Sequence, residues 1–336
     1  MTMNIHIKKD NIEWLTILRT INIILVVMFH IHLVDMTTGD NHSFCSTVTY
    51  PFNPIRMPLF IFISGGLLYV SRIKKNWNVL SLYKDKFIRI MIPFFFFVTI
   101  YFLFKAMLNG YVKTPVNISF SYYLESFVIY HNHSSAPLWF LATLMQLMLC
   151  YPIFRYACKN KVFMILLFIL AICAYFCDIS TLFDNNYFNY SDINFCFMFF
   201  YFGVIFFRYS LYKYLNKVFI CFSLILLYTI FFYLDINLIT SLIGIMAIVS
   251  IVVCFSKYLS IDVSYIGNHI YQIYLMSFIF QAFVELLLWK KLFYNENLFL
   301  LFYIINLSFG IFMPLLVTKI IEKCPYKFVR FCFGLK

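Results

Sequence analysis

The sequence is dominated by apolar runs of about 20 residues, the length of helix that spans a hydrocarbon core of about 30 Å. These runs recur from one end of the chain to the other. Of the 336 residues, 63% are hydrophobic and only 12% are charged, whereas an ordinary soluble domain is about 25% charged. Because so little polar surface is available, the sequence predicts an all-α, polytopic integral membrane protein.

We expect about ten transmembrane helices in one bundle. The first apolar run is too long for the apolar core of a signal peptide and contains Arg19, so it is expected to remain as the first span. No internal repeat or soluble segment interrupts the chain, so residues 1–336 are expected to form one domain. The predicted spans are 12–34, 51–71, 87–108, 138–157, 161–179, 193–210, 218–234, 236–256, 265–289 and 298–320.

The positive charges predict the orientation of these spans. With the N-terminus inside, most of the 26 Lys and Arg residues fall in cytoplasmic loops and tails, as the positive-inside rule requires. Both termini are therefore expected in the cytoplasm, with the protein in the cell inner (cytoplasmic) membrane. The net charge of +12 is explained by these loops, so nucleic acid is not an expected partner.

Cysteine usage gives no sign of a metal centre. Most of the ten cysteines lie inside predicted spans, where Cys behaves as a small apolar residue. There is no CxxC pair and no Cys/His ligand spacing. Neither a bound metal nor a disulfide framework is expected.

Two ionisable residues, Arg19 and His30, lie on the first predicted span. They are separated by three helical turns and about 20°, so a continuous helix would place them on one face, roughly 16 Å apart. Ionisable groups inside a membrane usually face the interior of the bundle, although Arg19 could also snorkel and His30 could sit in the interface. His32 would point elsewhere on the helix. Arg19 and His30 are therefore the first candidate site residues.

Several segments together resemble the membrane-bound acyltransferase-3 family. Arg19 and His30 form an R-x10-H pattern similar to the family's first-span signature. Similar motifs follow in the family's order and cover most of the chain: MPLFIFISGGLLYVSR (57–72), KDKFIRIMIPFF (84–95), LWFLATLMQLMLCYP (138–152) and YIGNHIYQIYLMSF (265–278). The resemblance implies O-acylation of sugars in polysaccharides, lipopolysaccharides or antibiotics.

The chain departs from the family pattern at two positions. The family commonly has R-x-x-R before the third span, whereas this chain has Lys86 and Arg89. A lysine keeps the charge but loses the planar fork of arginine, so phosphate binding is retained more readily than bidentate geometry. Many relatives have a histidine in the late motif where this chain has Ser277.

The resemblance implies a role for each candidate residue. His30 would be the base that accepts the proton of a sugar hydroxyl, because its reference pKa of about 6.5 suits neutral pH. Lys86 and Arg89 would bind the phosphates of the acyl donor, acetyl-CoA or another short acyl-CoA, at the inner mouth of the bundle. Arg19 would hold the pantetheine arm or acyl carbonyl, stabilise an oxyanion, or pair with a buried acid.

We therefore expect a membrane O-acyltransferase, with acetyl as the expected group and succinyl as an alternative. Its acceptor would be a cell-surface glycan or a lipid-linked saccharide. Membrane lipid would surround the protein, and polysaccharide biosynthesis proteins would be its partners. Two other functions stay open at this point. One is a polysaccharide exporter or flippase, since a polar stripe can line a pathway. The other is a non-catalytic membrane subunit of a polysaccharide synthase.

Two further features predict packing and anchoring. The run Ser64-Gly65-Gly66 in the second span is typical of close helix packing, with a backbone break beside a cavity as the alternative. Trp139 begins a predicted span, where an interfacial anchor is the usual role of tryptophan.

Overall fold

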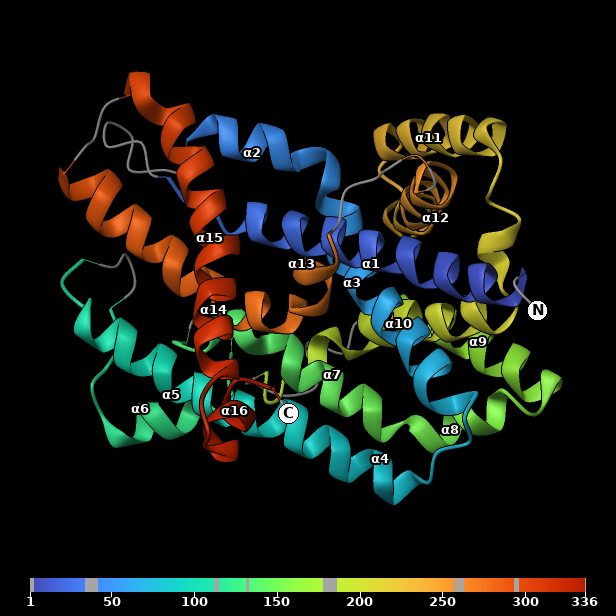
Figure 1. Ribbon diagram of the computed structural model, residues 1–336, viewed down its shortest axis with the longest axis horizontal. Coiled ribbons are helices and arrows are strands. Elements are labelled where there is room, and N and C mark those ends of the chain that lie inside the picture. Colours follow the sequence, from blue (N-terminus) through green and yellow to red (C-terminus); the bar gives the residue numbers. More distant parts are fainter. Residues whose placement is uncertain are drawn as a thin grey trace.

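The computed structural model of the protein is an all-helical bundle (Figure 1). It describes residues 3–33, 42–111, 115–130, 133–177, 186–256, 258, 263–292 and 296–335, with the backbone alone for residues 3–13, 291, 292 and 296. Within these ranges the extended structure is limited to one isolated antiparallel bridge, between Ile129 and Tyr187.

Helices occupy all ten predicted apolar segments. The main helices are α1 (Met3–Phe29), α3 (Asn53–Leu68), α4 (Val79–Lys86), α5 (Ile92–Met107), α7 (Trp139–Leu149), α8 (Tyr151–Ala157), α9 (Lys161–Tyr175), α10 (Ile193–Arg208), α11 (Val218–Tyr233), α12 (Asn237–Phe255), α14 (Ile270–Phe283) and α15 (Phe299–Glu322). The short helices α2 (Ser43–Thr49), α6 (Phe120–Glu125), α13 (Ser264–Asn268) and α16 (Lys327–Cys332) lie between or after them.

Many of these helices are long and apolar enough to cross a bilayer. Among the described residues, six helical segments meet that requirement, and α7 with α8, bent by 52°, makes a seventh when the pair is counted as one span. Three shorter apolar helices, Trp14–Phe29, Lys161–Tyr175 and Val218–Tyr233, cover the remaining predicted spans. The predicted polytopic membrane fold is confirmed, while the crossing of the bilayer by all ten segments stays a prediction.

Three of the described helical segments contain π-helical stretches, one of which, Val284–Leu292, follows α14. The chain leaves α3 through the π-helix Tyr69–Ile73, and another, Phe87–Met91, joins α4 to α5 without a break. A π-turn shifts the direction of the side chains that follow it and is often found at functional sites. The stretches that follow α3 and α4 carry Arg72 and Arg89, one in each.

The predicted packing role of the small residues in the second span is confirmed. A Cβ atom on Gly65 would overlap the backbone carbonyl oxygen of Phe200 in α10. In the opposite direction, a Cβ on Gly203 of α10 would overlap the carbonyl oxygen of Phe62 in α3. The two helices therefore touch through their backbones, which fixes α3 firmly beside α10.

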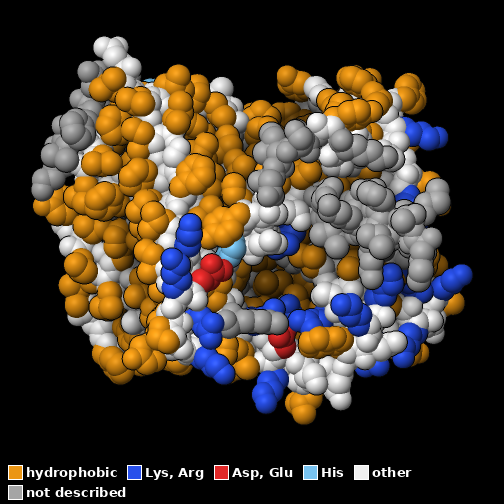
Figure 2. Space-filling model, viewed as in Figure 1, with side chains coloured by type: hydrophobic (Ala, Val, Ile, Leu, Met, Phe, Trp, Pro, Cys, Tyr) orange, Lys and Arg blue, Asp and Glu red, His pale blue; other side chains and the backbone are white. Residues whose placement is uncertain are grey.

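The face of the bundle seen in Figure 2 is mostly apolar, and its Lys and Arg side chains gather in one region. Figure 2 shows hydrophobic side chains over much of one face, while Lys and Arg side chains gather around α4 and α8. The same view shows a hollow near the centre of this face, with Lys and Arg side chains along its lower edge.

Candidate functional site

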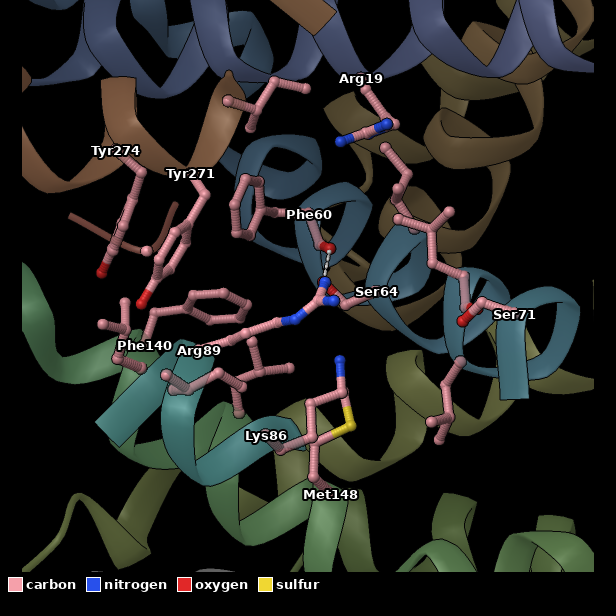
Figure 3. Close-up of a pocket in the computed structure, with 18 of the residues that line it drawn as sticks. Arg19, Phe60, Ser64, Ser71, Lys86, Arg89, Phe140, Met148, Tyr271 and Tyr274 are labelled. Atoms are coloured by element: carbon pink, nitrogen blue, oxygen red, sulfur yellow. Dashed lines mark hydrogen bonds between the residues drawn. The ribbon is translucent and has the colours of Figure 1, made fainter. Parts of the chain in front are cut away.

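A cavity of about 450 Å³ lies where α1, α3, α7 and α14 meet the segment from α4 to α5. Four basic side chains line it: Arg19, Arg72, Lys86 and Arg89. In Figure 3, Arg19 enters from one wall, and Lys86 and Arg89 enter from the opposite side. The predicted topology places the ends of the helices that carry these residues on the cytoplasmic side.

Asp85 holds two of these four cations. Its Oδ2 atom lies 2.8 Å from Nη2 of Arg72, and its Oδ1 atom lies 2.9 Å from Nε of Arg89. The indole of Trp77 stacks on the other side of Arg72, with the guanidinium carbon 3.4 Å from the ring centroid. One carboxylate thus fixes the positions of two guanidinium groups that start from different helices.

The other two cations, Arg19 and Lys86, have no ion pair or hydrogen bond in the part of the chain that the structure describes. The cavity therefore combines four cations with one carboxylate. Partly buried charges of one sign are costly unless an opposite charge is close. The arrangement favours a ligand with several negative charges.

Besides Nε of Arg72, three buried polar atoms of the cavity lining lack a partner. They are Oδ1 of Asn22, the hydroxyl of Tyr271 and Oε1 of Gln272. The amide nitrogen of Gln272 is already used, since it donates to the carbonyl oxygen of Phe333 at 3.1 Å. Buried polar groups in folded proteins are nearly always hydrogen-bonded. These three atoms are available to a ligand with amide or hydroxyl groups.

Aromatic rings close the far end of the cavity. Phe60 and Phe140 meet edge to face with ring centroids 4.7 Å apart, and each lies 5.9 Å from the ring of Tyr274. The Tyr274 hydroxyl donates to the carbonyl oxygen of Pro137 at 2.6 Å, so its ring is fixed. The cavity is thus polar and positive at one end and aromatic at the other.

His30 lies outside this lining. The helix α1 ends at Phe29, so His30 belongs to the turn that follows, where its backbone N–H donates to Val27 at 3.1 Å. Its ring meets Phe278 of α14 edge to face at 6.0 Å. The helix between Arg19 and Phe29 is continuous, which separates the two ends by about 15 Å along the axis.

The turn that carries His30 is held by polar residues of α14 and α15. Gln281 is buried and donates from Nε2 to the carbonyl oxygen of Val27 at 2.9 Å. Asn306 donates in turn to the carbonyl oxygen of Gln281 at 3.4 Å. Because Val27 already accepts the N–H of His30, this contact fixes the end of α1.

The structure brings together three of the four predicted site residues. Arg19, Lys86 and Arg89 share one cavity, whereas His30 lies beside α14 at the other end of α1. Ser277 is buried in α14, one turn after Tyr274, and is not part of the lining.

Sequence reasoning missed Arg72, Asp85 and Tyr271 as parts of the site. The late motif YIGNHIYQIYL contained the available signal for Tyr271. The structure breaks this motif at His269, between α13 and α14, and the break turns Asn268, Tyr271 and Gln272 toward the cavity.

Within the described ranges, no three His, Cys, Asp or Glu side chains lie together in a way that would hold a metal ion.

Comparison with known protein families gives a match that covers most of the chain. A family profile described as an acyltransferase domain, that of acyltransferase 3, matches residues 12–319. Neither curated proteins nor solved structures give a significant match. The matched range includes all four cations of the cavity and His30.

Proposed function

The chain belongs to the acyltransferase 3 family and is a membrane acyltransferase, and on this basis we propose that it transfers a short acyl group, most simply acetyl, from cytosolic acyl-CoA to a hydroxyl of a cell-surface glycan or its lipid-linked precursor. The observation that carries this proposal is the convergence of Arg19, Arg72, Lys86 and Arg89 on one cavity.

The positive end of the cavity suits the phosphates of the donor. Arg72 and Arg89 keep guanidinium N–H groups beyond those that contact Asp85, and arginine forks match phosphate oxygens geometrically. Lys86 adds a point charge beside them. We assign the nucleotide end of acyl-CoA to this cluster, next to the cytosol.

The unpartnered polar atoms suit the pantetheine arm, which carries two amide groups. The side-chain oxygens of Asn22 and Gln272 can accept amide N–H bonds, and the Tyr271 hydroxyl can donate to an amide carbonyl. Arg19 lies one turn before Asn22 on α1 and would bind a carbonyl oxygen of the pantetheine arm. About 15 Å of helix separates Arg19 from Phe29, so Arg19 would act on the donor and not on the carbonyl that is attacked beside His30.

We assign His30 to the acceptor. Its neutral imidazole would take the proton of the sugar hydroxyl while the hydroxyl oxygen forms a bond to the acyl carbon. The carbon–sulfur bond breaks, and CoA leaves as a thiolate that takes up a proton. Because Arg19 and His30 lie at opposite ends of α1, the thioester end of the donor must extend past the rings of Phe60 and Phe140 to reach His30.

The two alternative functions gain no specific support. An exporter or flippase needs a path through the bundle, whereas this cavity ends at Phe60, Phe140 and Tyr274. A non-catalytic synthase subunit has no need for four cations around unpartnered polar atoms.

The first part of the test is made in cells. We expect NMR of the purified surface polysaccharide to show ester groups with the wild type and none with His30→Ala, while the amount of exported polymer is unchanged. Unchanged esters, or polymer trapped inside the cell, would contradict the proposal.

The second part uses the purified protein in nanodiscs. Lys86→Gln should raise the Kd for CoA by about tenfold, the usual effect of losing one charge-assisted contact. Lys84→Gln is the matched control, because Lys84 lies on the same helix but is not part of the cavity lining. Equal Kd values for the two variants would remove the donor site from this cavity.

A further inference from the structure

A second cavity, of about 480 Å³, lies at the opposite ends of the helices. It is lined by the starts of α3, α7, α10 and α12 and by the end of α9, all of which the predicted topology places on the outer side of the membrane. We call it the outer pocket, and the side chains used below are Asn53, Arg56, Trp139, Tyr175, Asp192 and Asn237.

We call the first cavity, of about 450 Å³, the donor cavity, because the proposed function assigns acyl-CoA to it. A thin wall of aromatic rings separates the outer pocket from the donor cavity. Trp139 lines the outer pocket and the next residue, Phe140, lines the donor cavity, with their ring centroids 6.1 Å apart. Phe60, which packs against Phe140, is likewise one turn from Met57 of the outer pocket. A molecule in the outer pocket would lie close to the acyl end of the donor.

Arg56 provides a site for an anion in this pocket. Its guanidinium carbon lies 3.9 Å from the ring centroid of Phe29, the residue before His30. Within the described ranges Arg56 forms no ion pair and no hydrogen bond, so its N–H donors are available. A guanidinium group of this kind binds a carboxylate or a phosphate strongly.

The remaining lining suits a sugar ring. Trp139 and Tyr175 are both half-buried, and their aromatic faces can cover the C–H face of a pyranose. Asn53 and Asn237 supply amide donors and acceptors for hydroxyl groups, and the Asp192 carboxylate, which accepts a bond from Asn189 at 3.1 Å, supplies a further acceptor. Polar groups around an aromatic platform are the usual composition of a small-molecule site.

We propose that the outer pocket binds the acceptor as a sugar that carries a negative charge, with the ring against Trp139 and the charged group on Arg56. This inference rests on the proposed function and names the class of its acceptor. The charge can come from the carboxylate of an acidic sugar or from the phosphate of a lipid-linked precursor.

Saturation-transfer NMR of the full-length protein in nanodiscs tests the pocket without requiring acyl transfer. Three probes separate the possible sources of charge: methyl glucuronide, glucose 1-phosphate and neutral methyl glucoside. We expect saturation of the ring C–H protons of at least one charged probe and a much weaker effect on the neutral glucoside. A response to glucuronide alone indicates an acidic sugar, and a response to the phosphate alone indicates a lipid-linked precursor.

Variants assign the signal to the pocket. Arg56→Gln should abolish the preference for the charged probe, Arg56→Lys should restore part of it, and Trp139→Ala should remove saturation of the ring protons. Lys105→Gln removes another positive charge that the predicted topology places outside, but Lys105 is not part of the pocket lining, so the signal should persist. An unchanged Kd for CoA would show that each variant is folded.

Any of three results would overturn the inference. These are no saturation transfer to any probe with the wild type, signals that survive both Arg56→Gln and Trp139→Ala, and equal binding of the neutral glucoside. Failure of the proposed function would look different, because the polysaccharide would then carry the same esters with His30→Ala as with the wild type, or would stay inside the cell, whatever the outer pocket binds.

Discussion

Asp85 organises the positive end of the donor cavity at the scale of single residues. It lies four residues before Arg89 in the same helical segment, and it also reaches Arg72 across the gap between two segments. Without the carboxylate, the two guanidinium groups would repel each other and lose their fixed positions. An acidic residue can therefore be important for binding an anion.

We predict that Asp85→Asn raises the KM for acetyl-CoA severalfold and makes it more sensitive to salt. The variant makes the cavity more positive, so the phosphates of the donor are still attracted to it, but salt screens this attraction. The bidentate contacts between arginine and phosphate depend on fixed guanidinium positions, and these are lost with the carboxylate. The measurement is KM at two ionic strengths. Asp85→Glu, which keeps the charge, should retain part of the wild-type behaviour. A KM equal to that of the wild type would show that Arg72 and Arg89 need no anchor.

The sequence allowed some of these residues to be predicted but not others. Lys86 and Arg89 were predicted through the motif before the third span, and both line the cavity. Arg72 was missed because a cation at a cytoplasmic helix end looks the same in sequence whether it faces water or a cavity. His30 was expected on the same helical face as Arg19, but hydropathy cannot reveal that α1 ends at Phe29, since apolar residues continue beyond it.

At the scale of helices, the contact between α3 and α10 positions one wall of the donor cavity. The α3 helix supplies Phe60 and Ser64 to the lining on one side and packs through Gly65 against α10 on the other. The sequence predicted this packing from its small residues. It did not predict the π-helical stretches, because the extra residue in a π-turn changes neither composition nor apolar periodicity over a window of ordinary length.

We predict that Gly65→Ala lowers the free energy of unfolding of the detergent-solubilised protein by about 1–3 kcal/mol, the usual cost of overpacking, and therefore lowers its melting temperature. The added Cβ would overlap the carbonyl oxygen of Phe200, and backbone on both sides can relieve the overlap only if the helices separate. Gly110→Ala is the control, because a Cβ at that position meets no atom within 4 Å. Equal melting temperatures for both variants would contradict the close contact.

At the scale of the whole molecule, the C-terminal segment returns to the donor cavity (Figure 1). After α16, Phe333 packs against Phe96 and Phe97 of α5, and Gly334 is part of the cavity lining. The apolar segments along the chain predicted the membrane bundle. They could not predict this closure, because a contact between the last residues and Tyr271 leaves no periodic pattern in the sequence.

We predict that Gly334→Ala raises the KM for acetyl-CoA. Gly334 has a φ of +69°, a conformation that favours glycine, and an added Cβ would overlap the ring of Tyr271. Gly334→Asn separates the two effects, because Asn tolerates this φ but still carries a Cβ. If overlap is the cause, both variants should raise KM in steady-state assays. If Asn restores KM, backbone strain is the cause.

The ring wall formed by Phe60, Phe140 and Trp139 has an electrical consequence in the proposed orientation. Where cavities enter a membrane from both sides, the transmembrane voltage falls mainly across the insulating layer that remains between them. A neutral acetyl group crosses that layer without electrical work. A succinyl group carries one negative charge, so an inside-negative potential would drive it outward by about 2.3 kcal/mol per 100 mV. Because the voltage falls across this thin wall, the charge of the acyl group decides whether the membrane potential contributes to the transfer.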